Sequence, residues 1–547
     1  MSEVRVGEDD VSVDERAVND TVHGQILLDK VFYAVIDTAQ FQRLRRVKQL
    51  GVCDRVYPSA MHSRFEHSIG VCKLAKLMVE HLQHNQHRLN ITEVDKICVM
   101  MAALCHDLGH GPFSHLFEHF MLEEGQEFEH ESASVMIFRD IMADSGVLKE
   151  MEKTGLDEQD LKFIEEAIHG RDTKSTEWKY RGRGKDKAFL YDIVSNKFDG
   201  FDVDRYDYFL RDSKMTGVPV KFDQTTVRRI INNSRVYNID PTIGPGGIRI
   251  CFATHSIGRM MTWVGDTRFH LHDIVYQHKT VKAIELMMTD ILRKANPHLL
   301  FMGDDGVERR MSECNKNVGS YLKLDDSVLS LIRNSTDEAL EGARHLLCRL
   351  ETRKLYFQIG EVKPLPDDLN NDIEKKQRNV EEEIRKLAQK DCPDFDTKLI
   401  RVFKGMKHFG SGYDPPLANV LGYNHKNLAE EPFRAELPPL HPELCAVVEV
   451  TVFDAGDDRD SDRDAVIFAA LCKWCEQNNV KQHHDRNGRP LPPLTPRHIS
   501  LQRYGSGSTR SITPDAAVEP VEKSEAVKRN LSMMEDDQEM TVEAGDN

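Results

Sequence analysis

The sequence has few cysteines and no long apolar run. No stretch of about 18 consecutive apolar residues occurs, so we expect no membrane-spanning helix. The opening segment MSEVRVGEDDVSVDE is acidic and lacks the apolar centre of a signal peptide. The 11 cysteines show no framework spacing; only Cys472 and Cys475 form a CxxC pair, within a helical pattern that makes the pair incidental. We therefore expect a reducing compartment, the cytoplasm or the nucleus, and the sequence does not choose between them.

A surplus of positive charge is also missing. The net charge is −17 at pH 7, whereas proteins that bind duplex nucleic acid usually present a basic surface. An acidic total still leaves room for a local cluster of Arg and Lys, which is enough to hold a polyphosphate. A chain of 547 residues is too long for one hydrophobic core, and its 40% apolar and 30% charged residues are ordinary for a globular protein. We expect two or more lobes.

Helical periodicity dominates residues 18–355. Apolar residues recur at three-and-four spacing in the segments 37–51, 70–85, 93–109 and 337–354. Several of these segments end in Gly, which is typical of a helix C-cap. The segments SRVYNID and GIRICFA have β character and predict a small hairpin. We predict an all-helical main lobe over 18–355, preceded by a mobile tail over 1–17.

The composition changes after residue 355. Strand patterns in KLYFQIGEVKP, TKLIRVFKGMKH and LCAVVEVTVFD alternate with helical patterns at 370–390 and 463–479. This order predicts a smaller α+β lobe over 356–500, in which the segment 411–440 is a loop. The last residues, 501–547, are rich in Ser, Glu and Asp and are predicted to be disordered. The predicted fold class is mainly α, with an α+β C-terminal lobe.

The segment ALCHDLGHGPFSHLFEHF carries many titratable side chains directly behind the apolar run VMMAALC. A charged group beside a buried helix needs a partner or a metal. The adjacent pair His106-Asp107 is a mixed nitrogen and oxygen donor set, which suits Fe, Mn, Zn or Ni. By itself such a pair is better explained by a capped helix end with a hydrogen-bonded His. A metal would need further ligands, and the chain offers His67 upstream and Asp202, Asp204, Asp207 and Asp212 downstream.

The blocks RFEHS, HDLGHGPFSH and DVDRYDYF, in this order and at this spacing, resemble the motifs of the HD-domain deoxynucleoside triphosphate triphosphohydrolases. The resemblance is strongest to the animal enzymes that carry a sterile-alpha-motif domain before the HD domain. It runs from Val18 to Ile359 and more thinly to about residue 500, so we expect the sterile-alpha-motif domain to be absent. It implies an enzyme of dNTP catabolism and antiviral defence. Water would attack the α-phosphorus of a dNTP, releasing a deoxynucleoside and inorganic triphosphate.

The resemblance also assigns roles at the reaction centre. It implies a transition metal, Fe, Mn or Zn, with Mg²⁺ accompanying the nucleotides. The implied metal ligands are His67, His106, Asp107 and Asp204. A proton-transfer group stands beside them, in which His115 is the general acid and is oriented by Glu118 and His130. Glu118 replaces the family's Asp, and its longer arm moves the charge. His119 has no family role and is expected at the surface.

Substrate contacts follow from the same motifs. Arg is the usual residue for a triphosphate because it presents several donors at once. The positions that match the triphosphate contacts of the family are Arg64, His110, Arg205, Tyr208 and Arg268, and Gln277 matches a further substrate contact. Leu50 and Tyr276 match residues that exclude a 2′-hydroxyl, and Gln49 and Asp212 match residues that bind the 3′-hydroxyl. The resemblance therefore implies selection of deoxyribose.

Regulatory nucleotide sites at subunit junctions are implied as well, together with a homo-oligomer between dimer and tetramer. The residues that match a site for GTP or dGTP are Arg16, Asn19, Asp37, Gln42 and Arg45. A carboxylate accepts from the Watson–Crick edge of guanine, and Arg donates to its acceptors. The adjoining deoxynucleotide site matches poorly: Lys279 survives, but Ala253 and His255 replace positive residues and Asn233 replaces a stacking Phe. We expect dNTP activation to be altered, weakened or absent.

Two alternatives remain at this point. One is an HD-type hydrolase that acts on another phosphoester, such as a nucleotide monophosphate or a cyclic nucleotide; Leu50 and Tyr276 argue against it. The other is a nucleotide-regulated scaffold that binds single-stranded nucleic acid; the complete metal ligands and the net charge argue against it. Thr495 in PLTPRH matches a proline-directed phosphorylation site of the family, or is a chance Thr-Pro pair.

Overall fold

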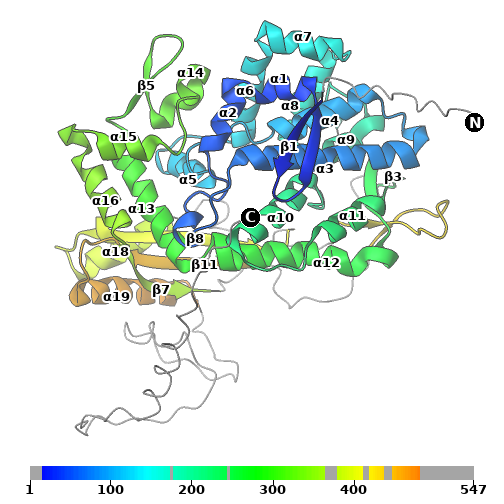
Figure 1. Cartoon of the computed structure of the whole chain (residues 1–547). Helices are drawn as coiled ribbons and strands as arrows, with labels where there is room; N and C mark the ends of the chain where they lie inside the picture. The colour runs from blue at the N-terminus through cyan, green and yellow to red at the C-terminus, as the bar shows by residue number, and fades with distance from the viewer. Residues whose placement is uncertain are drawn as a thin grey trace, which may run out of the picture. The chain divides into compact units, whose positions relative to one another are not determined.

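The structure is a computed structural model. It describes residues 15–172, 177–242, 247–363, 379–410, 418–435 and 446–480, and its elements are drawn in Figure 1. These residues all belong to one compact unit, Met1–Ile499. The predicted acidic tail over 501–547, most of the predicted N-terminal tail and Thr495 lie outside the described residues.

The described residues before 355 are mostly helical, as predicted. The helices are α1 Lys30–Ile36, α2 Ala39–Gln42, α3 Arg64–Asn85, α4 Glu93–Cys105, α5 His115–Glu123, α6 His130–Met142, α7 Ser145–Lys153, α8 Glu158–His169, α9 Ala188–Val194, α10 Val203–Thr216, α11 Gln224–Asn232, α12 Thr254–Leu271, α13 Lys279–Ala295, α14 Val318–Tyr321, α15 Val328–Asn334 and α16 Glu341–Glu351. A π-helical turn, His272–Tyr276, joins α12 to α13.

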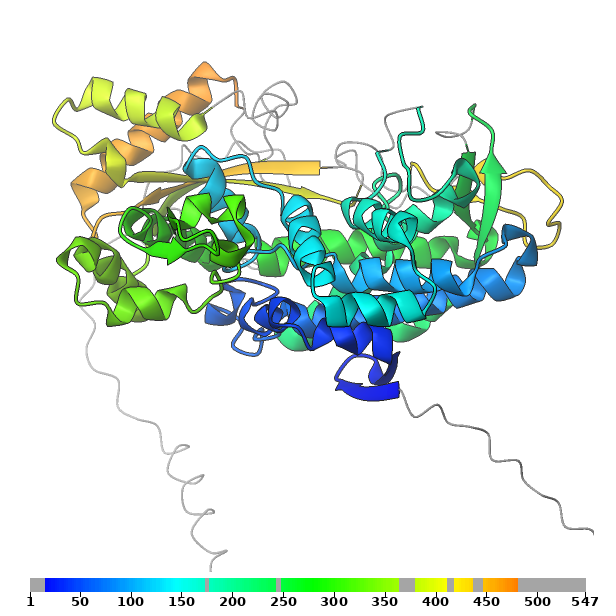
Figure 2. The same cartoon turned by 90° about the horizontal axis from the view of Figure 1, so that it is seen from above.

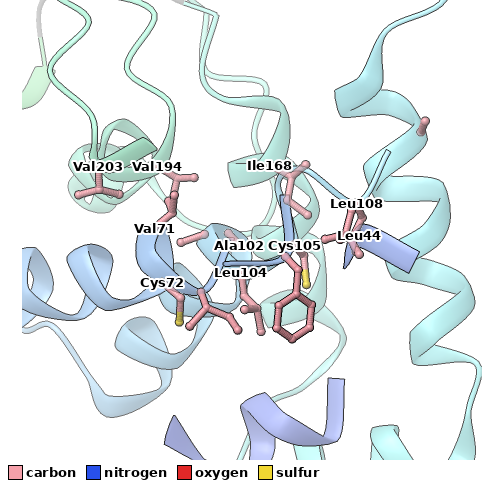
Figure 3. Close-up of a cluster of buried hydrophobic side chains, with 14 of the residues drawn as sticks. Leu44, Val71, Cys72, Ala102, Leu104, Cys105, Leu108, Ile168, Val194 and Val203 are labelled. Atoms are coloured by element: carbon pink, nitrogen blue, oxygen red, sulfur yellow. The ribbon is translucent and has the colours of Figure 1, made fainter. Parts of the chain in front are cut away.

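Helices α3 and α4 form the centre of this lobe. A capping box begins each helix: Ser63 pairs with Glu66 in the first turn of α3, and Thr92 pairs with Asp95 in the first turn of α4. The apolar run that ends α4 is buried, and Figure 3 shows Ala102, Leu104 and Cys105 among side chains from neighbouring elements. The packed core therefore fixes the point at which the chain leaves α4, one residue before His106.

The segment 37–51 is not the continuous helix that was predicted. It forms only α2 and a short 3₁₀ turn, Arg43–Arg46, and is extended at Val47. The backbone then pairs with the residues before α3: Gln49 N donates to His62 O at 3.0 Å, and Arg64 N donates to Val47 O at 3.0 Å. These backbone bonds outweigh the helical periodicity and bring Gln49 to the start of α3.

Three antiparallel strand pairs lie among the described residues of the main lobe. Strands β3 Ser234–Ile239 and β4 Gly247–Phe252 are antiparallel, which confirms the predicted hairpin. Strands β1 Glu15–Asp20 and β2 Gly24–Asp29 form a second one that was not predicted. The predicted mobile tail over 1–17 is therefore wrong at its end, because β1 begins at Glu15 and is held by paired backbone groups. A third pair consists of β5 Leu300–Met302 and β6 Glu308–Arg310.

The residues after 355 form a three-stranded antiparallel sheet with two helices. The strand order is β7 Phe357–Val362, β11 Ala446–Asp454 and β8 Ile400–His408. Helices α18 Val380–Asp391 and α19 Ser461–Gln477 lie side by side next to this sheet (Figure 2). They share a separate hydrophobic core with it, which includes Ile384, Val450 and Trp474. The strands and helices match the predicted α+β pattern, and its boundaries stay a prediction.

The segment 411–440 is not entirely loop. It contains the short strands β9 Leu421–Gly422 and β10 Phe433–Arg434. Strand β9 pairs with β4, so the two strands extend the β3–β4 hairpin into a four-stranded sheet. The Pro, Asn and Gly residues of this segment predicted a loop and did not indicate these two-residue strands.

Two further expectations concern membrane-spanning helices and the cysteines. Among the described residues, no helix combines the length and apolar character needed to cross a bilayer. Cys472 and Cys475 both lie on α19 and are free thiols.

Candidate active site

Three helix ends bring the four predicted metal ligands together. His67 lies in the first turn of α3, His106 and Asp107 follow the last residue of α4, and Asp204 lies in the first turn of α10. The Nε2 atom of His67 is 3.0 Å from Asp204 Oδ1 and 3.5 Å from Asp107 Oδ2. The Nε2 atom of His106 is 3.4 Å from the same Asp204 oxygen and 3.3 Å from Asp107 Oδ1. Two nitrogens and two carboxylates thus face one point.

Hydrogen bonds fix which nitrogen of each histidine is available. His67 Nδ1 donates to Asp207 Oδ2 at 2.7 Å, and His106 Nδ1 donates to Ala103 O at 2.8 Å. Neither Nε2 atom has a hydrogen-bond partner in the part of the chain that the structure describes, although both are buried. Two buried lone pairs aimed at two carboxylates fit a metal ion, and this mixed donor set suits a transition metal.

The local electrostatics keep the carboxylates ionised. Burial raises the pKa of Asp107, but the Arg64 guanidinium and His106 outweigh it and hold this pKa well below its usual range. Burial likewise raises the pKa of Asp204, and the contacts with His106 and His67 lower it further than burial raises it. A carboxylate must be deprotonated to bind a metal, so both groups are ready as ligands.

A second cluster contains the predicted proton-transfer residues. Glu118 Oε1 accepts from His130 Nδ1 at 2.6 Å, and Glu118 Oε2 lies 3.4 Å from His115 Nδ1. The His110 ring stacks on His130 with ring centroids 3.9 Å apart, and His110 Nε2 is 3.3 Å from the metal ligand Asp107. The cluster therefore adjoins the metal ligands, and the longer arm of Glu118 still reaches both histidines. His119 is 42% exposed, and its Nε2 atom lies 3.2 Å from Glu123 Oε1.

Charge is unevenly distributed over this cluster. Burial raises the pKa of Glu118, but the hydrogen bonds from His115 and His130 lower it far more. Burial lowers the pKa of His130, and Glu118 reverses that effect, so the net shift is upward. His110 is different: burial and the nearby Arg64 hold its pKa well below the usual value. The structure thus pairs an ionised Glu118 with a basic His130, beside a neutral His110.

The turn before α5 is strained. Phe113 and Ser114 both have positive φ, at 61° and 60°, which non-glycine residues rarely adopt. Ser114 Oγ accepts from Arg64 Nε at 2.8 Å and donates to Lys48 O at 2.6 Å, and Phe113 N donates to Asp326 at 2.7 Å. These contacts hold the strain in place, and they set the position at which His115 begins α5.

The predicted deoxyribose residues meet at Asp212. Its Oδ2 accepts from the Tyr276 hydroxyl at 2.5 Å, and its Oδ1 accepts from His62 Nε2 at 2.8 Å. Gln49 lies next to His62 through a backbone hydrogen bond, and its buried Oε1 has no partner among the described residues. Leu50 is half-buried. The structure therefore gathers Gln49, Asp212 and Tyr276 around one polar centre, with His62 as a support that the sequence did not reveal.

The predicted phosphate contacts fall into two groups. Arg64 is buried and donates to Asp107 at 2.5 Å, so it already neutralises a metal ligand. Arg205 and Tyr208 lie on α10, and Arg268 lies on α12. Burial raises the pKa of Tyr208 to about 12, and the positive charges of Arg205 and Arg268 oppose this rise, so both arginines lie near the Tyr208 hydroxyl. Of these two arginines, Arg205 is close to the predicted metal ligand Asp204, and Arg268 is close to Arg205 and Tyr208.

Strand β8 lies against the substrate residues. Arg268 Nη1 donates to His408 O at 2.7 Å, and Gln277 Nε2 donates to Met406 O at 2.9 Å. Between them, Lys407 Nζ is 2.8 Å from Asp273 Oδ1 in the π-helical turn that carries Tyr276. The C-terminal lobe thus supports the predicted substrate residues. No sequence pattern indicated Lys407, because its partner is 134 residues away.

The predicted guanine set forms its own group of contacts. Arg16 donates to both carboxylate oxygens of Asp37 at 2.8 and 2.9 Å, and Arg45 Nε donates to Gln42 Oε1 at 2.7 Å. Asn19 is exposed on β1. These side chains are partnered with one another at the surface. Lys279, from the second predicted site, is exposed at the start of α13.

The remaining candidate carboxylates have structural tasks. Asp202 caps α10 by accepting from Arg205 N at 3.0 Å. Asp207 faces the opposite ring nitrogen of His67 rather than the metal position. A spacing of three residues from Asp204 puts Asp207 on the same helix face, and this is the signal that could have identified it as a support of the metal ligands.

Comparisons with known proteins agree with this geometry. The HD domain family matches residues 64–198. The deoxynucleoside triphosphate triphosphohydrolase SAMHD1 of Homo sapiens is 34% identical over 539 residues, which cover 95% of this chain and 81% of the relative. The protein of the same name from Xenopus laevis is 34% identical, covering 88% of this chain and 77% of the relative. A SAMHD1 homolog of Dictyostelium discoideum is 36% identical over 63% of this chain and 60% of its own length.

Proposed function

The chain belongs to the SAMHD1 family of deoxynucleoside triphosphate triphosphohydrolases, and we propose that it is a metal-dependent enzyme that hydrolyses a dNTP to a deoxynucleoside and inorganic triphosphate. One observation carries the proposal. Two buried histidine Nε2 atoms, which have no hydrogen-bond partner among the described residues, face the carboxylates of Asp107 and Asp204, beside a second cluster of proposed proton-transfer groups.

The reaction needs polarisation of a phosphoryl centre and a proton for the leaving oxygen. A metal held by His67, His106, Asp107 and Asp204 supplies Lewis-acid activation and a template for the phosphoryl centre. Fe, Mn and Zn all suit these ligands. Arg205 and Arg268 bring positive charge to the same region and would hold the triphosphate. The bond between the α-phosphorus and O5′ breaks, and the triphosphate leaves with the oxygen of the attacking water.

His115 is the proposed donor of the proton to O5′. It is the exposed end of its cluster, with 71% of its side chain accessible, so a substrate can reach it. Glu118 faces His115 Nδ1 and is fixed on its other side by His130, so the carboxylate orients the ring and stabilises its protonated form. His110, kept neutral, separates this charge from the metal ligands.

Selection of deoxyribose is assigned to the centre formed by Asp212, Tyr276 and Gln49. The Tyr276 ring is positioned by its hydrogen bond to Asp212, and it would fill the space of a 2′-hydroxyl. Asp212 and the unpartnered Gln49 Oε1 would bind the 3′-hydroxyl, and a buried group left unpaired costs about 1–3 kcal/mol.

Regulation is proposed to use guanine nucleotides. Asp37, Gln42 and Arg45 present a carboxylate, an amide and a guanidinium on one surface, and Arg16 adds a positive charge for phosphate. Binding there would exchange the contacts among these side chains for contacts with GTP or dGTP, at a junction between subunits of a homo-oligomer.

The proposal is tested by hydrolysis of a single dNTP in ¹⁸O-labelled water, with the products identified by mass spectrometry. We expect intact triphosphate that carries one ¹⁸O atom, and an unlabelled deoxynucleoside. Label in the deoxynucleoside would place the attack at carbon. Pyrophosphate or monophosphate as the first product would favour another phosphoester reaction and overturn the proposal.

A further inference from the structure

The turn between β1 and β2 reaches the support of a metal ligand. His23, in this turn, donates from Nε2 to Asp207 Oδ1 at 2.6 Å. The other oxygen of Asp207 accepts from Nδ1 of the metal ligand His67 at 2.7 Å. A single carboxylate therefore connects His23 with His67, although the two histidines come from separate elements.

A second contact joins the same turn to the same carboxylate. Arg211 donates to Asp207 from Nε at 2.9 Å and from Nη2 at 3.0 Å, and its Nη1 donates to Asp20 Oδ2 at 2.8 Å. These side chains are nearly inaccessible: exposure is 6% for His23, 0% for Asp207, 1% for Arg211 and 4% for Asp20. A buried charge pair with complete hydrogen bonds is geometrically well defined.

The neighbouring residues leave room for this contact and hold the turn in place. Gly70 on α3 leaves the space for it, since a Cβ at this position would come within 2.0 Å of Asp207 Oδ1 and 2.5 Å of Arg211 Nη2. The turn is also held internally: Asp20 Oδ1 accepts from Val22 N at 2.8 Å and from His23 N at 2.7 Å. His23 therefore approaches Asp207 from a rigid turn.

The other end of the hairpin carries part of the proposed guanine site. Arg16 lies on β1, four residues before Asp20, and its partner Asp37 follows α1. Arg16 also lies over the ring of Tyr33, 4.2 Å from the ring centroid. One short hairpin thus contacts both the proposed nucleotide site and the support of His67.

We propose that His23 is a positioning residue of the metal centre and that the β1–β2 hairpin links guanine-nucleotide binding to metal affinity. The nucleotide half of this inference rests on the proposed function. An acceptor on Nδ1 fixes the tautomer and orientation of a metal-binding histidine, and the loss of such support typically costs 10–100-fold in metal affinity. If nucleotide binding moves the hairpin, linkage requires that metal and nucleotide alter each other's affinity by the same factor.

The first experiment measures Mn²⁺ affinity by competition with a chelator. His23→Leu removes the donor to Asp207, His23→Gln keeps an amide donor, and His298→Leu changes an exposed histidine as a matched control. We expect affinity to fall about 10–100-fold in His23→Leu, to recover partly in His23→Gln and to stay unchanged in the control. Unchanged Mn²⁺ affinity in folded His23→Leu would overturn the positioning role.

A purely structural role gives a different result. It would lower the melting temperature of the metal-free protein and leave the further rise on adding Mn²⁺ unchanged in His23→Leu. The inference instead expects this metal-induced rise to shrink. If His23→Leu does not fold, Asp20→Asn tests the same turn, because it removes an oxygen that accepts from Arg211 and keeps an oxygen for Val22 N and His23 N. Full Mn²⁺ affinity in that variant would count against the inference.

The second experiment measures Mn²⁺ affinity with and without GTP, and GTP affinity with and without Mn²⁺. We expect equal factors of about fivefold or more in the unaltered chain and a factor near one in His23→Leu. GTP binding without any effect of Mn²⁺ would overturn the linkage. Absence of GTP binding would instead contradict the proposed guanine site, and a lowered Mn²⁺ affinity in His23→Leu would still support the positioning role.

Discussion

The metal centre and the guanine set differ in how their polar groups are satisfied. At the proposed metal centre, both histidines have one nitrogen held and the other without a hydrogen-bond partner among the described residues, and their side chains are 1% and 11% exposed. In the proposed guanine set, Arg16 and Asp37 are about half exposed, at 50% and 51%, and bind each other. The first region is preorganised to receive a ligand within one chain. The second would instead exchange internal contacts for those of a nucleotide.

This difference separates the consequences of substitutions. A change in the metal centre should remove the ion and therefore all turnover. A change in the guanine set should alter regulation and leave the metal content of the nucleotide-free protein intact. Substitutions that violate this division would show that the two regions are not organised as the contacts indicate.

The largest effect is expected for the metal ligands. Asp204→Ala, or the double change His106→Ala with Asp107→Ala, removes one or two donors, and we expect both bound metal and dNTP turnover to fall to background. Metal is measured by mass spectrometry and turnover by triphosphate release. Asp240→Ala, at an exposed turn, is the control. Turnover in metal-free variant protein would contradict the ligand assignment.

The proton-transfer cluster should give the next largest effect. Glu118→Gln keeps the shape but removes the charge that faces His115 and His130, so we expect kcat to fall about 10²–10⁴-fold. Metal content should stay constant, because Glu118 does not contact the metal ligands His67 and His106. Glu118→Asp should retain more activity than the Gln variant, and Glu127→Gln serves as an exposed control. Equal rates for the Gln variant and the unaltered chain would exclude the role.

Sugar selection should respond more moderately. Tyr276→Ala opens the space next to Asp212, and we expect the preference for dCTP over CTP, as a ratio of kcat/KM, to fall about 10–100-fold. Cytidine nucleotides are chosen because GTP is itself a proposed activator. Tyr276→Phe keeps the ring and loses only the hydroxyl, so it should keep most of the selectivity. An unchanged ratio in Tyr276→Ala would assign the selection to other residues.

A change in the guanine set should have a smaller and more local effect. Asp37→Asn removes the charge that would pair with guanine, and a hydrogen bond to a charged group contributes about 1.5–3 kcal/mol, so GTP affinity should fall roughly tenfold or more. Calorimetry measures this affinity, with Asp29→Asn as an exposed control. Loss of bound metal in Asp37→Asn in the absence of nucleotide would contradict the separation of the two regions.

The smallest effect is expected at the second predicted nucleotide site. Lys279 is its one matching positive residue, whereas Ala253 and His255 offer no fixed charge, so we expect subunits to assemble without a dNTP analogue. Analytical ultracentrifugation with no nucleotide, with GTP, and with GTP plus a dNTP analogue measures this. A tetramer that forms only in the last mixture, at micromolar analogue, would refute the expectation.

The sequence indicated the helices and the candidate ligands better than the contacts that support them. Periodicity indicated α3 and α4, and the family resemblance named His67, His106 and Asp204 as candidate ligands, which the fold brings together. The same periodicity was wrong for 37–51, because backbone pairing with 62–64 replaces the helix. Contacts such as His23 with Asp207 were not predictable, since 184 residues separate the partners and only the packed fold decides which side chains meet.

One metal ion at the HD site is proposed to activate the dNTP, so that intact triphosphate is released. The most direct test is titration of metal-free protein with Fe²⁺, Mn²⁺ or Zn²⁺ while triphosphate release from one dNTP is followed. We predict that the rate rises in proportion to bound metal, saturates at about one ion per chain, and yields triphosphate as the only phosphate product. Full turnover before metal is added, or release of pyrophosphate in its place, would contradict the account.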